Sequence, residues 1–209
     1  MIKKTLFLPI FFALSFSACF SLPQFPSMPS FPSLEKINPF SSDEEKKSKK
    51  KIKIPDDAPK WLQEREIKNN IQAIGLSLIK KENPNKKELN FNKQKALISA
   101  SQNLTKKIYS KTLKLYTNYV NNLDNPKVFE KDIKKTSEHI ALSSLKKAKI
   151  KNLWLNKNEE IYVQIVVDSD IVATLIQNNS KILFKVDKNL YKEFLSNRAK
   201  KDIIINLEK

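Results

Sequence analysis

The hydrophobic and polar positions of this chain follow three patterns in succession. Residues 6–16 form a short apolar run, whereas residues 20–55 show no period and are rich in proline, serine and lysine. From residue 56 onward, strand-like alternation and helix-like three- and four-residue spacings replace one another. Regular periods mark elements that bury one face, so we expect one folded domain over residues 56–209. Its length of roughly 150 residues is common for a single domain.

Three segments of the domain have strand character: residues 71–78, 150–155 and 160–167. The last two are joined by the turn-forming residues 156–158, which predicts a hairpin. We expect Trp154 on the first strand of this hairpin to pair with an aliphatic residue on the second. Gly75, the only glycine of the chain, indicates a bulge or a close approach of another backbone segment to the first strand.

Two long helices are predicted between the first strand and the hairpin. The first spans about residues 92–121, with Asn90 or Asn92 as its N-cap. Its apolar stripe comprises Leu97, Ala100, Leu104, Ile108, Leu115 and Tyr119. The second helix begins at Asn125, whose side chain is the expected cap, with Pro126 at the first helical position. Its apolar side comprises Phe129, Ile133, Ile140, Leu145 and Ala148.

Shorter elements complete the domain at both ends. Trp61, in an entry segment over residues 59–62, is expected to pack on the core. After the hairpin, one of residues 168–170 should cap a short helix, and an amphipathic segment follows over residues 190–199. Residues 203–205 either add a last strand or pack against the domain. The whole pattern predicts an α+β fold, with a small antiparallel sheet packed against two long helices.

The N-terminus has the three parts of an export signal. Lys3 and Lys4 precede the apolar run, and small residues at positions 17 and 18 precede Cys19. The apolar run is too short to span a bilayer, which takes roughly 20 residues. The segment Phe16-Ser17-Ala18-Cys19 resembles the lipobox of bacterial lipoproteins, with Phe16 in place of the usual Leu.

The lone cysteine distinguishes two interpretations of this signal. Cys19 has no partner for an internal disulfide, because the chain contains no other cysteine. Lipidation gives the thiol a use, so we predict removal of residues 1–18 and acylation of Cys19, with palmitate among the attached chains. Several acyl chains anchor a protein stably to a membrane. The alternative is an ordinary signal peptide followed by an unrelated cysteine.

Residues 19–55 form a predicted tether between the lipid and the domain. Prolines alternate with serines and large apolar residues over residues 22–33, which favours an extended, semi-rigid spacer. Six lysines over residues 46–53 follow, a charge block that is usually solvated. We expect the tether to be disordered. An alternative role for Phe25 and Phe31 is contact with a partner or with the lipid interface.

The chain is strongly basic, with a formal net charge of +17, or +15 once Lys3 and Lys4 leave with the signal. Such a charge suits nucleic acid, but arginine, the preferred reader of phosphates and bases, occurs only at Arg65 and Arg198. Export also separates the protein from cytoplasmic nucleic acid. We therefore expect no nucleic-acid partner, and we retain binding to peptidoglycan or another anionic envelope polymer as the alternative function.

The residue inventory argues against an active site. His139 is the only histidine, and lipidation consumes the only cysteine, so no His/Cys metal cluster or Cys-His nucleophile pair can form. A single glycine excludes the usual Gly-rich phosphate loops. We expect no catalytic residue, no cofactor and no metal, and we interpret His139 as a structural or surface residue.

The best acidic constellation is Asp168-Ser169-Asp170, whose two carboxylates are suited to Mg²⁺ or Ca²⁺. Helix capping explains the same residues without a metal, and we favour it. The pairs Asp56-Asp57 and Glu159-Glu160 are expected to be solvated. Asn103-Leu104-Thr105 matches a glycosylation sequon, but Leu104 belongs to the helical stripe, so we attribute this match to chance.

Several short motifs occur in a recognisable order. Pro59-Lys60-Trp61 follows the lipid-accepting cysteine, and a strand then contains Ala73-Ile74-Gly75-Leu76-Ser77. A helix with spaced alanines at positions 96 and 100 follows, and later a strand with the run Tyr162-Val163-Gln164-Ile165-Val166-Val167. This layout resembles the LPP20 family of bacterial lipoproteins over roughly residues 55–180. The chain departs from the family in its Lys- and Asn-rich helix and in its long Phe/Pro/Ser tether.

The resemblance implies an outer-membrane lipoprotein, and some members of the family are flagellar accessory proteins needed for motility. The expected function is therefore non-enzymatic: a lipid-anchored cell-envelope protein with a structural or assembly role. Phe20 stands where inner-membrane lipoproteins commonly have Asp, so we expect the outer membrane, with its periplasmic face favoured over the cell surface. The expected partners are the membrane, through the lipid, and further copies of the chain or other envelope proteins.

Overall fold

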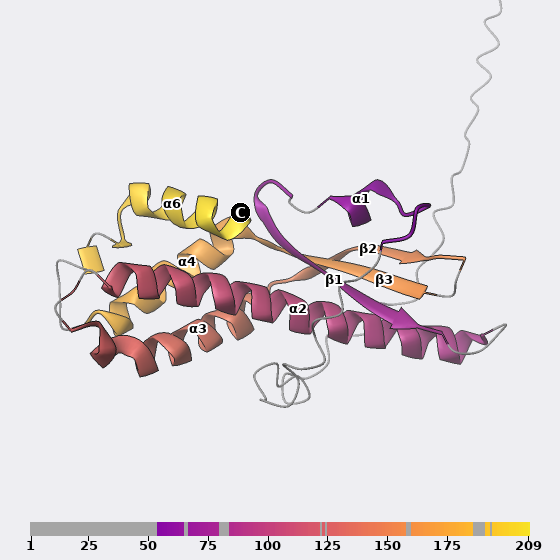
Figure 1. The fold of residues 1–209 in the computed structure, drawn as a ribbon, viewed down its shortest axis with the longest axis horizontal. Helices are drawn as coiled ribbons and strands as arrows, with labels where there is room; N and C mark the ends of the chain where they lie inside the picture. The colour runs from indigo at the N-terminus through magenta and orange to yellow at the C-terminus, as the bar shows by residue number, and fades with distance from the viewer. Residues whose placement is uncertain are drawn as a thin grey trace, which may run out of the picture. The chain divides into compact units, whose positions relative to one another are not determined.

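The computed structural model describes residues 54–64, 67–79, 84–121, 123, 125–157, 160–185, 191–192 and 194–209. The predicted signal peptide, Cys19 and the tether up to residue 53 lie outside this part of the chain. The described domain is α+β, with a three-stranded antiparallel sheet packed against long helices, as the hydrophobic pattern predicts (Figure 1). None of the described helices is both long and apolar enough to cross a membrane.

The elements follow in the order α1 (Lys60–Gln63), β1 (Asn70–Leu78), α2 (Lys86–Val120), the 3₁₀ helix η2 (Pro126–Phe129), α3 (Glu130–Leu145), β2 (Lys149–Leu155), β3 (Glu160–Asp168), α4 (Ser169–Leu183) and α6 (Asn197–Glu208). The N-terminal half of α2 lies along the sheet, and its C-terminal half packs with α3, α4 and α6 (Figure 1). The helix α2 therefore joins a sheet layer to a helical bundle.

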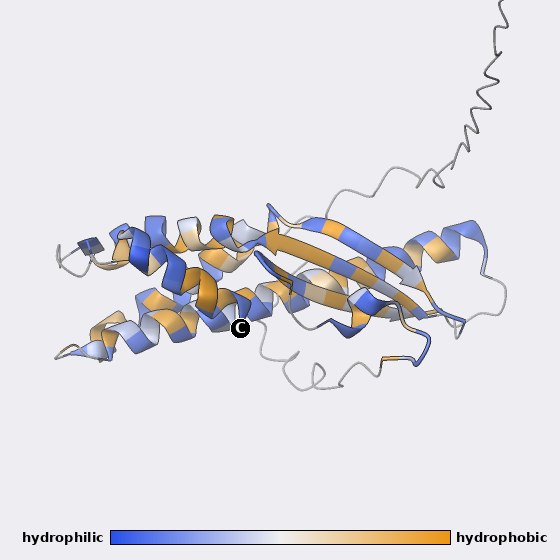
Figure 2. Cartoon of the chain, turned by 90° about the horizontal axis from the view of Figure 1, so that it is seen from above, coloured by the Kyte–Doolittle hydropathy of each residue, from blue (hydrophilic) through white to orange (hydrophobic). Residues whose placement is uncertain are grey.

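The hairpin β2–β3 is confirmed, and β3 lies at the centre of the sheet between β1 and β2. Trp154 lies opposite Tyr162, with ring centroids 5.4 Å apart. The predicted aliphatic partner of Trp154 is therefore wrong. The alternation along β3 places its aliphatic residues on the other face of the sheet, where Ile161, Val163, Ile165 and Val167 are buried in the main core. The central strand β3 is accordingly mostly hydrophobic in Figure 2, whereas β2 alternates between hydrophilic and hydrophobic residues.

The outer face of the sheet is covered by the segment that enters the domain. Leu62 and Ala58 are buried against Tyr162, and Trp61 packs on the same cluster, which confirms the prediction that it joins the core. Hydrogen bonds between polar side chains also hold this segment against the sheet. Gln164, fully buried, donates to the Gln72 side chain, and Gln72 donates in turn to the carbonyl of Glu64 at 2.8 Å. This chain of bonds ties the end of α1 to the sheet.

The inner face of β1 packs directly on α2 at Gly75. A Cβ atom at this position would lie 2.8 Å from the Ala100 Cα and closer still to the Ala96 carbonyl oxygen. Gly75 thus marks a close backbone approach, one of the two predicted alternatives, because the β1–β3 register runs without interruption past it. The bulge of this sheet lies instead in β2, between Ile150 and Asn152.

The N-terminus of α2 differs from the prediction. Asn85 is the N-cap: its side chain accepts from the Glu88 amide at 2.9 Å, and the Glu88 carboxylate accepts from the Asn85 amide at 3.0 Å. The predicted caps Asn90 and Asn92 are wrong, since both lie inside the helix. Asn92 is buried and accepts a hydrogen bond from the Ser77 hydroxyl at 2.9 Å. Because the first residues of α2 are mostly polar, the hydrophobic pattern did not reveal the first turn of this helix.

The second long helix is confirmed, with a change at its start. Pro126 occupies the first turn as predicted, but this turn is the 3₁₀ helix η2, and the Asn125 side chain makes no capping bond. The predicted cap at Asn125 is therefore wrong. The apolar side of α3 is confirmed, because Ile133, Ile140, Leu145 and Ala148 are buried and Phe129 packs against them.

The C-terminal elements are helical. Asp168 caps α4 as predicted, and this helix is 15 residues long rather than short. Ser196 caps α6, with its hydroxyl accepting from the Ala199 amide at 3.0 Å, so residues 190–199 are not one amphipathic segment. Residues 203–205 lie within α6, so the strand alternative is wrong and the alternative that they pack against the domain is confirmed. Ile203 and Leu207, four residues apart, are buried while Ile205 is exposed, which is the helical period.

Candidate functional site

The acidic pair at the start of α4 serves structural contacts. The Asp168 carboxylate accepts from the Asp170 amide at 2.7 Å, and the Asp170 carboxylate lies 2.7 Å from the Lys200 ammonium of α6. The two carboxylates thus have different partners, one a helix end and the other a neighbouring helix. Within the described ranges, no three His, Cys, Asp or Glu side chains are grouped as metal ligands. The contacts favour the capping interpretation over the Mg²⁺ or Ca²⁺ alternative.

The other polar candidates are dispersed over the domain. His139 is exposed on α3. The Asn103 side-chain amide donates to the Ile74 carbonyl at 2.8 Å, and Leu104 and Thr105 are fully buried, so the sequon lies in a packing interface. These residues do not converge on one place, and Cys19 lies outside the described residues.

The adjacent acidic pairs differ from one another. Asp56 and Asp57 are exposed, as predicted. Glu160 is not simply solvated: its carboxylate accepts from the Tyr162 hydroxyl at 2.8 Å and from the Asn156 side chain. Burial, and then the hydrogen bond to Glu160, raise the pKa of the Tyr162 phenol above its usual range. This carboxylate therefore fixes the hairpin turn and the outer face of the sheet.

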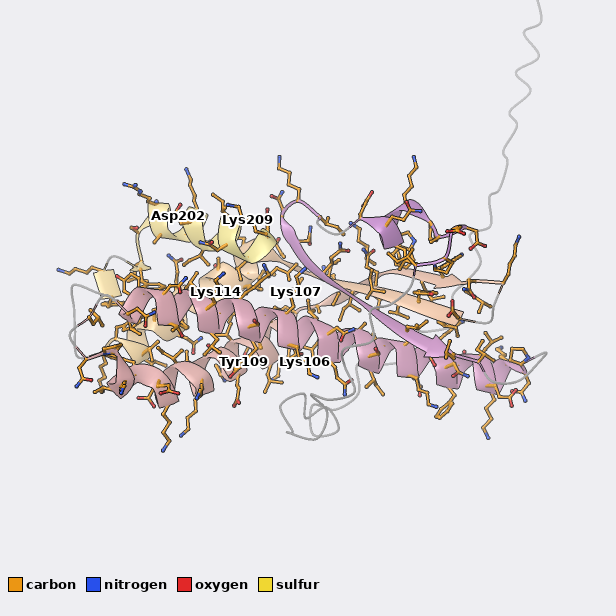
Figure 3. The ribbon with its side chains drawn as sticks, viewed as in Figure 1. Lys106, Lys107, Tyr109, Lys114, Asp202 and Lys209 are labelled. Carbon is orange, nitrogen blue, oxygen red and sulfur yellow. The ribbon has the colours of Figure 1, made fainter. Side chains whose placement is uncertain are left out.

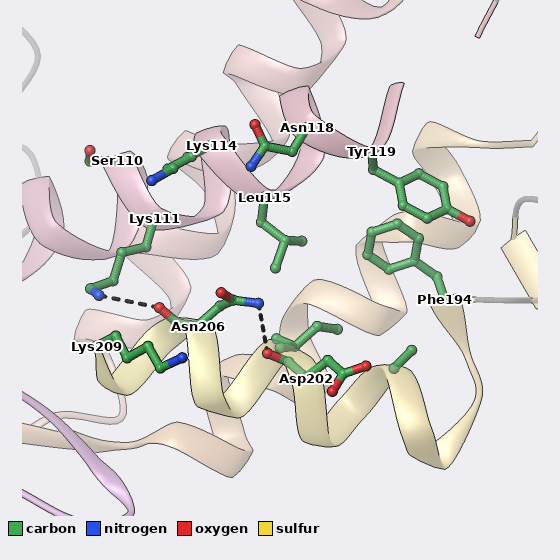
Figure 4. Close-up of a pocket in the computed structure, with 12 residues that line it drawn as sticks. Ser110, Lys111, Lys114, Leu115, Asn118, Tyr119, Phe194, Asp202, Asn206 and Lys209 are labelled. Atoms are coloured by element: carbon green, nitrogen blue, oxygen red, sulfur yellow. Dashed lines mark hydrogen bonds between the residues drawn. The ribbon is translucent and has the colours of Figure 1, made fainter. Parts of the chain in front are cut away.

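A groove of about 640 Å³ lies between the C-terminal half of α2 and α6 (Figure 4). The two helices run in opposite directions along it, because Lys111 of α2 donates to the Asn206 carbonyl at 3.3 Å while Tyr119 contacts Phe194, just before α6. The lining residues recur at three- and four-residue spacings on each helix, as one face of a helix does. They are Ser110, Lys111, Lys114, Leu115, Asn118, Tyr119, Phe194, Ala199, Asp202, Ile203, Asn206 and Lys209.

Aromatic rings close one end of the groove and lysines lie toward the other, with Asp202 between them on α6 (Figure 4). Leu115 lies in its middle, and the rings of Tyr119 and Phe194 close one end at a centroid distance of 4.3 Å (Figure 4). Lys111 and Lys209 lie toward the opposite end, and Lys114 lies on the α2 side. Figure 3 shows Lys114 on the side of α2 that faces α6, whereas the Lys107 ammonium donates to the Gln72 carbonyl of β1 at 3.4 Å.

Sequence reasoning missed this groove because it depends on α6. Leu115 and Tyr119 were predicted in the core stripe of the first long helix, but the fully buried positions continue from Ile108 to Tyr116, in steps of four residues. Leu115 and Tyr119 are half-buried at the border of the core instead. The sequence contained one indication of the groove: Leu115 and Tyr119 do not continue the four-residue spacing of the buried positions, so they mark a second, partly buried face of α2.

Comparison of the chain with protein-family models, with curated proteins and with solved structures gives no match. The interpretation of the domain therefore rests on its own residues.

Proposed function

We propose that this chain is a non-enzymatic, lipid-anchored protein of the bacterial cell envelope with a structural or assembly role. The observation that carries the proposal is the lone Cys19 directly after a short apolar signal with small residues before the cleavage point. Residues 20–53, which separate Cys19 from the described domain, are long enough to hold the domain away from a membrane surface.

The contacts of the domain support a role without chemistry. The acidic pair Asp168 and Asp170 is engaged by a helix end and by Lys200. The buried phenol of Tyr116 donates to the Ile176 carbonyl at 2.8 Å, inside a cluster of aromatic rings. Burial raises the pKa of this phenol well above its usual value, which keeps it neutral and unsuited to act as a base near neutral pH.

The proposed location is the outer membrane, with the domain on the periplasmic face. Phe20 follows the cysteine where an inner-membrane retention signal commonly has Asp. The resemblance of the motif order to LPP20 lipoproteins adds a flagellar accessory role to the proposal. Partners are then further copies of the chain or other envelope proteins.

Metabolic labelling with a palmitate analogue tests the anchor. The wild-type chain should incorporate the label and remain with membranes after a salt wash, whereas Cys19→Ser should lose both properties. A matched Ser21→Ala variant changes a residue close to Cys19 but keeps the Cys19 thiol, so it should behave as wild type. An unlabelled wild-type chain, released by salt, would contradict the lipid anchor.

Soft-agar motility and cross-linking test the role. A deletion strain that swims only when complemented with the wild-type gene, and not with Cys19→Ser, would support a lipid-anchored part of motility. Normal swimming of the deletion strain would remove the flagellar role.

Cross-linking in intact cells tests the assembly role. It should yield a ladder of products or a heteromeric product, and monomer alone at native abundance would contradict assembly.

A basic surface favours a second candidate, a binding module for peptidoglycan or another anionic polymer. Exposed lysines occur on several elements, including Lys86, Lys131, Lys149 and Lys201. Retention on purified sacculi that disappears by about 0.5 M salt would support it, because exposed charges are strongly screened there. No retention at low salt would exclude this candidate.

A further inference from the structure

We propose that the groove between α2 and α6 binds a single acyl chain that carries an anionic group, such as the carboxylate of a fatty acid. The residues that carry this proposal all lie in the described domain, so it does not rest on the lipid anchor proposed at Cys19, which lies outside the described residues. Its volume of about 640 Å³ is within the range of roughly 300–1,000 Å³ that is typical of small-molecule sites.

The apolar part of the groove suits the chain of such a ligand. Leu115 of α2 and Ile203 of α6 line it. The rings of Tyr119 and Phe194 close its end (Figure 4). Phe194 and Ile203 are themselves buried, so this end of the groove belongs to the packed bundle. Aliphatic and aromatic walls favour an alkyl chain, because burial of apolar area is the main favourable term. The charged side chain next to these walls is that of Asp202, which neighbours Ile203 on α6.

The cationic part suits the anionic group. Lys114 and Lys209 line the groove with exposed side chains, and within the described residues neither ammonium group has a carboxylate partner. Lys111 is held toward α6 by its bond to the Asn206 carbonyl at 3.3 Å. Three lysines line the groove, against the side-chain carboxylate of Asp202 and the α-carboxylate of Lys209, so positive charges exceed negative ones by one.

The polarity of the groove selects this ligand over the other anions of the envelope. A polymer such as peptidoglycan needs an extended polar track, and the aromatic wall of Tyr119 and Phe194 ends the groove after a short distance (Figure 4). An inorganic anion would leave the apolar part unfilled. An acyl chain with one charged end fills both parts at once.

Titration of residues 19–209, with Cys19→Ser so that no lipid is attached, tests the proposal with oleate as the probe and methyl oleate as its neutral counterpart. Oleate should saturate one site per chain and bind more tightly than methyl oleate. The double variant Lys114→Gln/Lys209→Gln should weaken oleate by about threefold to tenfold, the effect of two exposed charge pairs, and leave methyl oleate unchanged. Lys157→Gln, in the distant hairpin turn, is the matched charge control and should have no effect.

Filling the groove gives the second test. Ala199→Trp should weaken both oleate and methyl oleate by more than tenfold while the far-ultraviolet circular dichroism stays unchanged. Asn118→Trp, which fills the groove from the exposed side of α2, replaces this variant if Ala199→Trp does not fold. Asp202→Asn should tighten the binding of oleate and leave that of methyl oleate unchanged, because it removes the acidic side chain of the groove.

Three results would overturn the proposal: the absence of saturable oleate binding, oleate binding that both tryptophan variants leave intact, or equal affinity for oleate and methyl oleate in the wild-type chain. The first two would show that no acyl chain occupies this groove. The third would show that the lysines do not recognise an anionic group.

Discussion

Gly75 of β1 and Ala100 of α2 approach so closely that no side chain fits between the two backbones. A Cβ atom on Gly75 would lie 2.8 Å from the Ala100 Cα and nearer still to the Ala100 amide nitrogen. The neighbouring Asn103 side chain donates to the Ile74 carbonyl at 2.8 Å and fixes the same contact. The close packing of β1 on α2 therefore depends on the absence of a side chain at position 75.

Gly75→Ala should destabilise the domain by about 3 kcal/mol or more, since backbone atoms on both sides cannot move aside as a flexible side chain would. Chemical denaturation followed by circular dichroism measures the change. Leu78→Ala, at the exposed end of the same strand, is the control and should cost less than about 1 kcal/mol. Equal small losses for both variants would contradict the close approach.

Asn85→Ala should remove the capping box of α2 and reduce the free energy of unfolding by about 1 kcal/mol. Asn90→Ala tests the cap that the sequence suggested. This residue is exposed within the helix, so alanine should be neutral or stabilise by a few tenths of a kcal/mol. If Asn90→Ala were the more harmful change, the helix would begin later than at Lys86.

Tyr116→Phe should cost about 1 kcal/mol at pH 8, because it removes the bond to the Ile176 carbonyl. Burial raises the pKa of this phenol, so the folded chain keeps the proton above pH 10 while the unfolded chain releases it. Wild-type stability therefore falls as pH rises, and this phenol contributes about 1.4 kcal/mol per pH unit to the fall. The difference between wild type and variant should shrink from pH 10 to pH 11, and a constant difference would contradict a buried neutral phenol.

Asp168→Ala should cost about 1 kcal/mol through loss of the α4 cap. Asp170→Ala should cost less, because its ion pair with Lys200 is partly exposed and such pairs contribute about 0–1 kcal/mol. Millimolar Mg²⁺ or Ca²⁺ should leave the melting temperature of wild type and both variants unchanged. A rise in the wild type alone would restore the metal interpretation of this pair.

Local rules predicted the elements whose partners are close in the sequence. The hairpin β2–β3, the Asp168 cap and the buried side of α3 follow from alternation, turn residues and helical spacing, all of which act over a few residues. The start of α2 was missed because its first turn is polar and is held by the Asn85–Glu88 box rather than by apolar burial. Residues 203–205 were ambiguous because a three-residue apolar run fits either period.

The groove depended on contacts that no local pattern contains. Leu115 and Tyr119 were assigned to the core, yet they border a groove between α2 and α6, which Lys111 bridges to Asn206 and the rings of Tyr119 and Phe194 close. Lys111 meets Asn206 and Tyr119 meets Phe194 across sequence separations of 95 and 75 residues, so no local pattern contains these contacts.

The α+β class, the strand with its single glycine and the expectation of a lipid anchor at Cys19 follow from the amino-acid sequence, because each depends on residue types within a short window. The three-dimensional arrangement was needed to establish which backbone lies against Gly75, which residue pairs with Trp154 and where the lysine-lined groove lies. These features arise between segments that are distant in the chain, and their geometry is set by the packing of whole helices against the sheet.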